Sequence, residues 1–204
     1  MNLAEFSAQL HSRARRSSVE HLLKGIEEPL YRYVELLRRW NATINLTALS
    51  LDPITPDTFD RLLIEPLAVA TRLADVRGPW FDLGSGGGSP AIPIKVVLPH
   101  LDLTMVEARE RKAAFLREAV RALGLGGTSV ETLRFEALRK RAEFAGSAGL
   151  ITVRAVRMDE EFQELCAYLL RDHGILVPIG CSGVELQGFT FDSETEFFRR
   201  KCST

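Results

Sequence analysis

Two carboxylates and a run of glycines are the residues of this sequence best suited to hold a ligand. Asp82 lies near the end of an apolar run, and the turn Gly84-Ser85-Gly86-Gly87-Gly88-Ser89 follows it. Glycines adopt positive φ and let the backbone approach a ligand closely. Glu107 ends the next apolar run, 25 residues after Asp82, where an acid can accept hydrogen bonds from ribose hydroxyls. The pattern predicts a site for a nucleoside-containing ligand at this turn.

The residues after the glycines narrow the kind of ligand. No Lys-Ser or Lys-Thr pair follows them, which disfavours a phosphate-binding P-loop and favours a ligand without a triphosphate. We expect Ser89 to cap a helix that starts at Pro90 and directs its free N–H groups at the ligand. A nicotinamide dinucleotide and S-adenosylmethionine (SAM) both suit such a turn, so an oxidoreductase and a methyltransferase remain open at this point.

The elements that must position these residues alternate between strand and helix. This alternation predicts an α/β fold with a parallel, doubly wound, Rossmann-like sheet. The expected strands are 81–83, 103–106, 129–133, 150–153 and 175–179. A helix over 109–123 should stop at Gly124. Two β-prone runs, 184–191 and 195–200, flank Asp192-Ser193-Glu194 and predict a C-terminal antiparallel hairpin, which methyltransferase sheets have and an ordinary dehydrogenase half does not.

The first 65 residues predict an N-terminal helical extension packed on a catalytic domain of residues 66–204. Apolar residues recur at helical spacing over 27–40, a loop is expected over 49–60 because of its two prolines, and a helix should resume over 61–73. No flexible spacer separates the two parts. The arginines of this region either form an RNA-facing patch or lie on a solvated helix face: Arg13, Arg15, Arg16, Arg32, Arg38 and Arg39.

Several stretches of the sequence resemble one protein family. The run Asp82-Leu-Gly-Ser-Gly-Gly-Gly-Ser-Pro-Ala-Ile-Pro-Ile is similar to the SAM-binding motif of the bacterial glucose-inhibited division protein B family, the guanine-N7 methyltransferases of small-subunit (16S) ribosomal RNA. The family's other motifs resemble Trp40-Asn41-Ala-Thr-Ile-Asn45-Leu46-Thr47, Lys112-Ala-Ala-Phe115-Leu116-Arg117, Arg134-Phe135-Glu136 and Arg154-Ala155-Val156. These matches span about residues 30 to 180.

The resemblance implies a SAM-dependent methyltransferase that acts on ribosomal RNA or the small ribosomal subunit. The residues expected at SAM are Asp82, Gly84, Ser85, Gly86, Gly88, Ser89, Glu107, Phe135, Glu136 and Arg154. Asp82 would face the ligand's ammonium group, and Phe135 and Glu136 are placed near adenine by the resemblance alone. Arg154 and Asn45 would position the base. Guanine N7 already carries a lone pair, so alignment is needed rather than a general base.

Each of these residues also has a purely structural interpretation. Asp82 could bond the backbone N–H groups of its own turn. Arg154, directly after an apolar strand, could be the partner in a structural ion pair. Asn45 and Thr47 could cap or turn the chain after the helix.

The sequence departs from the family mainly on the substrate side. The family's Arg-His-x-x-Asp-Ser-Leu is replaced by Arg61-Leu62-Leu63-Ile64-Glu65-Pro66-Leu67. Ser89 replaces an aromatic residue, Ala91 a glycine and Val153 a serine, and the family's Lys-Gly becomes Ile179-Gly180. Two alternatives to the rRNA methyltransferase therefore remain: a SAM-binding module with lost or altered activity, and a dinucleotide-dependent oxidoreductase.

Composition sets the outer limits of these interpretations. The 204 residues suit one domain with a small appendage, and a net charge of −1 gives no general attraction to nucleic acid. Cys166, Cys181 and Cys202 are widely spaced and, with the four scattered histidines, match no metal-site spacing. No apolar run approaches the roughly 20 residues that span a bilayer. We therefore expect a cytoplasmic monomer with no metal and no membrane contact.

Overall fold

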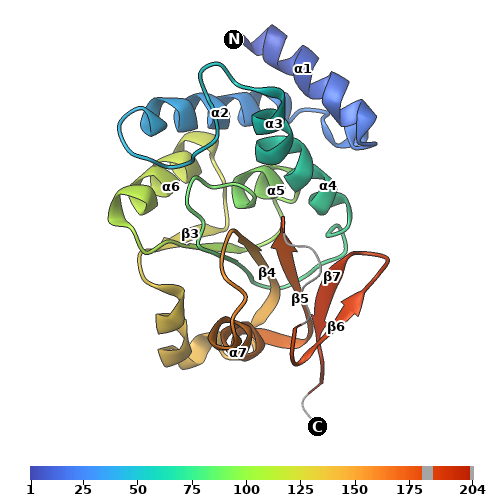
Figure 1. Ribbon diagram of the computed structural model, residues 1–204, viewed down its shortest axis with the longest axis vertical. Coiled ribbons are helices and arrows are strands. Elements are labelled where there is room, and N and C mark those ends of the chain that lie inside the picture. The colour runs from blue at the N-terminus through green and yellow to red at the C-terminus, as the bar shows by residue number, and fades with distance from the viewer. Residues whose placement is uncertain (181–185, 203–204) are drawn as a thin grey trace.

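Seven strands form one sheet in the order β3-β2-β1-β4-β5-β7-β6 in the computed structural model, which describes residues 1–180 and 186–202 (Figure 1). The strands are β1 (Trp80–Leu83), β2 (Leu103–Val106), β3 (Thr128–Glu131), β4 (Ala148–Arg154), β5 (Leu170–Ile179), β6 (Phe189–Asp192) and β7 (Phe197–Arg200). The first five run parallel, and β7 is antiparallel to both β5 and β6. The predicted doubly wound sheet and C-terminal hairpin are confirmed.

The hairpin differs from its prediction in where it begins. The strand expected over 184–191 is observed as β6, which begins at Phe189, and residues 184 and 185 lie outside the described part of the chain. The turn forms as expected, because Asp192 Oδ1 accepts the amides of Glu194 and Thr195 at 3.0 and 3.3 Å. A short polar side chain bonding the backbone two residues on is what stabilises such a turn.

Helices cover both faces of the sheet. They are α1 (Leu3–Arg16), α2 (Glu27–Asn41), α3 (Pro56–Phe59), α4 (Glu65–Thr71), α5 (Ala91–Val97), α6 (Glu110–Leu123) and α7 (Glu160–Leu169). Shorter helical turns are η1 (Glu20–Leu22), the π-helical η2 (Asp60–Ile64), η3 (Phe135–Lys140) and η4 (Ala142–Phe144). Helix α6 ends at Gly124, whose φ of 63° confirms it as the predicted stop.

The loop predicted over 49–60 is wrong at its C-terminal end, because helix α3 already starts at Pro56. Thr55 Oγ1 accepts the amide of Thr58 at 3.2 Å and caps the helix. A proline at the first helical position loses no intrahelical hydrogen bond. The prolines of this segment therefore mark a helix start rather than a continued loop, and helical structure runs from Pro56 to Thr71.

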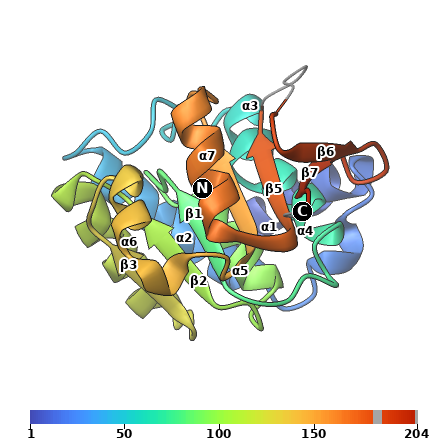
Figure 2. The same ribbon diagram turned by 90° about the horizontal axis from the view of Figure 1, so that it is seen from below.

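Two apolar clusters pack on opposite faces of the sheet. Successive side chains of a strand point to opposite faces, so Trp80 packs with the N-terminal helices and α6 while Phe81 packs with α7. Figures 1 and 2 show the N-terminal helices and α7 on opposite sides of the sheet. Asp82, two residues after Trp80, faces the side of the N-terminal helices.

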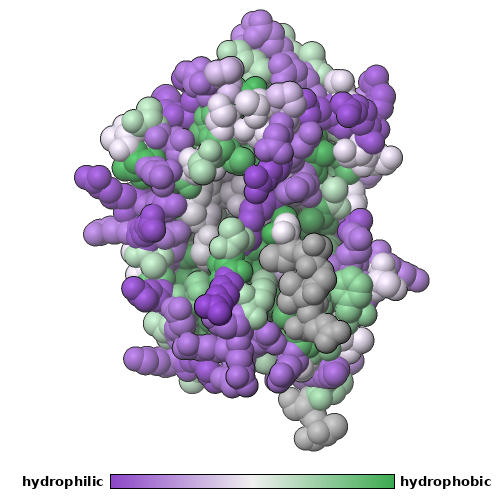
Figure 3. All heavy atoms as spheres, in the orientation of Figure 1, coloured by the Kyte–Doolittle hydropathy of each residue, from purple (hydrophilic) through white to green (hydrophobic). Residues whose placement is uncertain are grey.

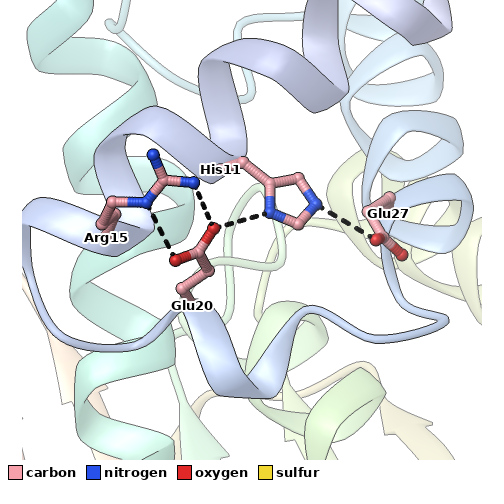
Figure 4. A network of polar contacts seen from close by, with 4 residues as sticks. All are labelled: His11, Arg15, Glu20 and Glu27. Carbon is pink, nitrogen blue, oxygen red and sulfur yellow. Dashed lines mark hydrogen bonds and ion pairs between the residues drawn. The ribbon is translucent and has the colours of Figure 1, made fainter.

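A polar network joins α1 to the next two helical segments (Figure 4). His11 lies 3.3 Å from a carboxylate oxygen of Glu20 on one side and of Glu27 on the other. Arg15 donates to both carboxylate oxygens of Glu20, at 3.0 and 2.8 Å. Hydrogen bonds from Arg15 and then from His11 lower the pKa of Glu20 to about 2. The network fixes α1 against the start of α2.

The division of the chain at residue 65 stays a prediction. In the structure Glu65 lies inside the helical stretch Pro56–Thr71, and the apolar cluster of the N-terminal helices continues into β1, β2 and α6. Among the described residues, no helix combines the length and apolar character needed to cross a bilayer.

Candidate active site

The Gly-rich turn lies between β1 and α5, at the carboxyl end of the parallel strands. Gly84, Gly86 and Gly88 have φ of 78°, 52° and 85°, which side-chain-bearing residues rarely adopt. The amides of Gly84 and Ser85 donate to the Val106 carbonyl at 2.9 and 3.1 Å and fasten the turn to β2. A Cβ added at Gly86 would meet only the Gly84 carbonyl, at 3.7 Å. The backbone at Gly86 is therefore open to a ligand.

Ser89 does not cap helix α5, contrary to the prediction. Its hydroxyl donates to the Leu62 carbonyl at 3.0 Å, and Pro90, with φ −91° and ψ −12°, is the residue before the helix. The amide of Ile92 is already bonded to the Gly88 carbonyl at 2.7 Å. The physical reason is tertiary: the helical segment that contains Leu62 packs beside α5 and offers the Ser89 hydroxyl an acceptor. Ser89 thus ties the turn to the N-terminal helices.

Glu107 clamps the turn from the end of β2. One carboxylate oxygen accepts the amide of Gly86 at 2.9 Å and the other accepts the amide of Arg109 at 2.8 Å. The residue is only 8% exposed. A carboxylate oxygen has more than one acceptor site, so Glu107 can hold the turn and still accept a ligand hydroxyl. This placement agrees with the predicted ribose contact, which stays a prediction.

Asp82 is buried under the turn and bonded to β4. Its Oδ1 accepts the Thr152 hydroxyl at 2.6 Å, and Thr152 Oγ1 in turn accepts the indole N–H of Trp80 at 2.8 Å. Burial raises the pKa of Asp82 to about 6, while the Thr152 hydroxyl and the Arg154 charge act in the opposite direction. The purely structural interpretation held that Asp82 bonds only the backbone of its own turn. It does not account for the hydrogen bond that Asp82 accepts from Thr152 on the neighbouring strand β4.

Helix α2 contributes a hydrogen bond to the turn. The Tyr33 hydroxyl donates to the Gly87 carbonyl at 2.7 Å. The side chain is fully buried, which raises the pKa of Tyr33 and keeps the hydroxyl protonated as a donor. A Cβ at Gly87 would lie 3.3 Å from Leu37 Cδ1 and 3.5 Å from the Leu46 carbonyl oxygen. The turn is thus packed directly under the N-terminal region.

The loop after α2 is organised by Asn41. Its Oδ1 accepts the amides of Leu46 and Thr47 at 2.8 and 2.9 Å, and Lys112 Nζ donates to the Leu46 carbonyl at 3.3 Å. Asn45, which the family resemblance placed beside the substrate, is exposed in this loop, next to Leu46. Thr47 accepts the amide of Leu49 at 3.1 Å and has the turn-forming role of its structural interpretation. Asn45 remains a predicted substrate contact.

The residues after β3 lie in the helical turn η3. Phe135 is half-buried and packs edge-on against Phe162 of α7, with ring centroids 5.4 Å apart. Glu136 is exposed. Both stand at the carboxyl end of the sheet, next to the strand that Glu107 terminates. Their contact with adenine stays a prediction.

Arg154 at the end of β4 is engaged with the N-terminal helices. Its guanidinium donates to the Arg61 carbonyl at 2.6 Å and to Glu65 Oε2 at 2.8 Å, and the side chain is 17% exposed. Burial lowers the pKa of Arg154, and the Glu65 carboxylate opposes that change. Arg154 therefore forms an ion pair with Glu65, as in the structural interpretation given above. Asp82 and Tyr33 are close enough to influence the same pKa, so the guanidinium also borders the turn.

The donor and acceptor set at the turn fits SAM. Asp82 and Glu107 supply carboxylates suited to an ammonium group and to ribose hydroxyls, and open backbone lies between them at Gly86. In residues 1–180 and 186–202 no group of three or more His, Cys, Asp or Glu could hold a metal ion. In the view of Figure 3, hydrophilic residues lie along the edge and also across the middle of the molecule, with hydrophobic patches between them. A hollow of about 540 Å³ between α1 and α2, lined by Glu35 and Arg38, is separate from the turn.

Three residues with direct roles around the turn were missed in the sequence. Tyr33 was assigned to the apolar face of its helix, and the spacing gave no sign of its hydroxyl bond to Gly87. Thr152 was read only as part of an apolar strand. Asn41 belongs to the matching N-terminal motif, which was the one available signal for its role in the loop.

Comparison with known proteins identifies the family. Residues 26–188 match the GidB family, described as rRNA small subunit methyltransferase G. The chain belongs to this family. Ribosomal RNA small subunit methyltransferase G of Stenotrophomonas maltophilia (strain K279a) is 42% identical over 153 residues, which cover 75% of this chain and 68% of that protein. The protein of the same name from Xanthomonas campestris pv. campestris (strain B100) is 39% identical over 73% of this chain and 66% of its own length.

One solved structure is similar in fold to this GidB-family chain. A crystal structure of a protein from Corynebacterium glutamicum has a TM-score of 0.52 and 17% sequence identity, and covers 72% of this chain and 66% of that one. The resemblance noted in the sequence is confirmed by the family match, and SAM is the cofactor of the GidB family.

Proposed function

We propose that this GidB-family protein transfers the methyl group of SAM to N7 of a guanine in 16S ribosomal RNA, as a cytoplasmic monomer. The observation that carries the proposal is the clamp of Glu107 on the Gly86 amide. The turn it holds resembles the family's SAM-binding motif and lies within the residues that match the family. The relatives are named ribosomal RNA small subunit methyltransferases. When bound, SAM supplies an electrophilic methyl group on its sulfonium.

The residues of the chain would divide into two groups in this reaction. Glu107 would bind the ribose hydroxyls and Asp82 the ammonium group, with Gly84, Ser85, Gly86, Gly88, Ser89, Phe135 and Glu136 completing the cofactor site. Guanine N7 needs no deprotonation, so the remaining task is to align the base with the methyl group. Alignment can supply up to roughly 7–11 kcal/mol in favourable cases.

Arg154 would orient the guanine or its phosphate. Its planar guanidinium is already held by Arg61 and Glu65, which reduces the rotamer entropy lost when a substrate binds. A guanidinium has five N–H donors, so two protein contacts leave donors for an RNA group. Asn45, exposed in the loop after α2, would contact the same substrate.

Methyl transfer to ribosomal RNA tests the proposal. The protein is incubated with isotopically labelled SAM and either small ribosomal subunits or naked 16S RNA, and the modified nucleotide is mapped by mass spectrometry. Mapping of rRNA from cells with and without the gene gives the same information in vivo. We expect 7-methylguanosine at one position. Binding of SAM without transfer would instead identify a SAM-binding module, and calorimetric binding of NAD without SAM would identify the oxidoreductase.

A further inference from the structure

Trp80, Thr152 and Asp82 form a buried chain of two hydrogen bonds. An indole N–H can only donate, so Thr152 Oγ1 accepts it, at 2.8 Å. An ionised carboxylate can only accept, so the Thr152 hydroxyl gives its own proton to the ionised form of Asp82, at Oδ1 and 2.6 Å. The three residues are 0%, 0% and 1% exposed. The register places Thr152 directly beside Asp82 on the neighbouring strand β4.

This chain of hydrogen bonds opposes the effect of burial on the pKa of Asp82. Burial raises the pKa of Asp82 to about 6, and the Glu107 charge adds to that rise. Thr152 gives the largest opposing contribution, followed by Ser85 and then the Arg154 charge. Tyr33 is the other titratable group facing this region, and its raised pKa keeps it neutral. A carboxylate that served packing alone would be replaced at lower cost by a neutral side chain. Here the Thr152 hydroxyl donates a charge-assisted hydrogen bond to the Asp82 carboxylate.

We propose that Thr152, oriented by Trp80, is a positioning residue that keeps the Asp82 carboxylate ionised and directed at the ammonium group of the bound cofactor. The inference rests on the proposed SAM site. Asp82 stands where β1 enters the Gly-rich turn, so a cofactor at Gly86 brings its amino acid portion near this carboxylate. Without the Thr152 proton, Asp82 would hold its own proton near neutral pH and lose its attraction for a cation.

The experiment compares two ligands that differ in the amino acid portion. S-adenosylhomocysteine carries the ammonium group, and 5′-methylthioadenosine lacks the whole amino acid. Calorimetry between pH 5 and pH 8 on Thr152→Val should show, at pH 7, about tenfold weaker binding of S-adenosylhomocysteine and less than twofold change for methylthioadenosine. The pH below which S-adenosylhomocysteine binding weakens should rise by about one unit.

Matched variants separate positioning from packing. Thr152→Ser keeps the hydroxyl and should restore wild-type binding. Thr104→Val makes the same change on strand β2, where the hydroxyl lies 3.1 Å from that of Ser129 at the surface, and should change nothing. Trp80→Phe removes the orienting N–H together with part of the buried indole ring. It should shift the pH dependence in the same direction by less than Thr152→Val, and it keeps the test valid if Thr152→Val does not fold.

Titration of the Asp82 carboxyl carbon by NMR in ligand-free protein gives a readout independent of binding. Its midpoint should move upward in Thr152→Val and return in Thr152→Ser. Equal losses for the two ligands, or an unchanged midpoint, would overturn the inference. Wild-type protein that bound neither ligand would overturn the proposed cofactor and the ammonium assignment with it, while the NMR titration would still decide whether Thr152 keeps Asp82 ionised.

Discussion

The cofactor side and the acceptor side of the site are held by contacts that differ in their separation along the sequence. On the cofactor side, Glu107 bonds the amide of Gly86, 21 residues earlier and on an adjacent strand-turn unit. On the acceptor side, Arg154 bonds Arg61 and Glu65, which lie 93 and 89 residues earlier in the N-terminal helices. The clamp of Glu107 on the turn therefore follows from local strand-turn-helix geometry, although Tyr33 and Thr152 reach the cofactor side from distant segments. The contacts of Arg154 on the acceptor side exist only once the N-terminal helices have docked.

The departures from the family motifs fall mainly on the acceptor side, although Ser89 and Ala91 also depart at the cofactor turn. Leu62 stands where the family has a histidine and Pro66 where it has a serine, and both are buried in the structure. The acid of the motif is kept as Glu65, which pairs with Arg154. The family's polar residues are thus replaced by Leu62 and Pro66, which pack into the core. Glu65, which binds Arg154, keeps the negative charge of the motif.

The largest effect is expected from Gly86→Val, which attacks the cofactor side at its backbone. A β-branched residue is strained at a φ of 52°, and its side chain would occupy the open space beside Gly86. SAM affinity measured by calorimetry should fall by about a hundredfold or more, with the fold still detectable by circular dichroism. Gly126→Val is the control, because Gly126 has no neighbour within 4 Å of an added Cβ. Retained SAM binding would refute the assignment of the turn.

Asp82→Asn should stabilise the protein while weakening the cofactor side. The raised pKa of Asp82, about 6 against the usual 3.8, means that the folded protein holds this proton more tightly than the unfolded chain. The folded state therefore loses stability as the pH rises from about 4 through 6, by up to about 3 kcal/mol. Urea unfolding at pH 4 and pH 8 should show a gain in the variant at pH 8 only. Asp75→Asn, an exposed acid, should show none, and an equal gain at both pH values would contradict a charged Asp82.

Glu107→Ala tests the ribose contact. It removes one or two charge-assisted hydrogen bonds to the ligand, each worth roughly 1.5–3 kcal/mol, and also releases the Gly86 amide. SAM affinity should fall by at least about tenfold. Glu110→Ala removes an exposed acid from the first turn of α6 and serves as the control. Unchanged affinity in Glu107→Ala would end the ribose assignment.

The sequence predicted what depends on local pattern. The run of strands, the stop at Gly124, the hairpin turn at Asp192 and the clustering of Asp82, the glycines and Glu107 at one sheet edge all follow from alternation, turn chemistry and strand order. The exceptions are the starts of two helices and of two strands, since β5 begins at Leu170 rather than 175 and β6 at Phe189 rather than 184. Pro56 and Ser89 were misjudged because their roles depend on a cap at Thr55 and on an acceptor from a distant helix.

What could not be predicted are hydrogen bonds between segments far apart in the sequence. The Tyr33 bond to Gly87 spans 54 residues, and the Thr152 bond to Asp82 spans 70. Neither side chain interrupts the apolar pattern of its own helix or strand, so periodicity gave no reason to expect a polar partner. The Arg154 pair was left open for the same reason, since only the docked helices supply Glu65.

Arg154→Lys tests the acceptor side. Lysine keeps the charge but loses the planar fork that holds Arg61 and Glu65 and would contact the substrate. Methyl transfer to ribosomal RNA should fall by at least tenfold, about 1.4 kcal/mol of transition-state stabilisation, while SAM dissociation changes less than threefold. Arg157→Lys changes an exposed arginine three residues further along, in the loop after β4, and is the control. Equal losses of turnover and of SAM affinity would make Arg154 a cofactor ligand, and no loss in either would leave it as a structural ion-pair partner.

Tyr33→Phe carries the smallest expected effect and asks whether the two sides are independent. The substitution removes only the hydroxyl that α2 donates to the Gly87 carbonyl, so a buried acceptor loses its partner, at a net cost of about 1 kcal/mol. If the N-terminal helices set the conformation of the turn, SAM affinity should fall by roughly two- to fivefold together with the free energy of unfolding. Tyr31→Phe, on the same helix, removes a hydroxyl bonded to the Met1 carbonyl at 3.3 Å in an exposed position and should change neither. Lower stability with unchanged SAM affinity would instead show that the turn keeps its shape without α2, and that the cofactor side depends on local geometry alone.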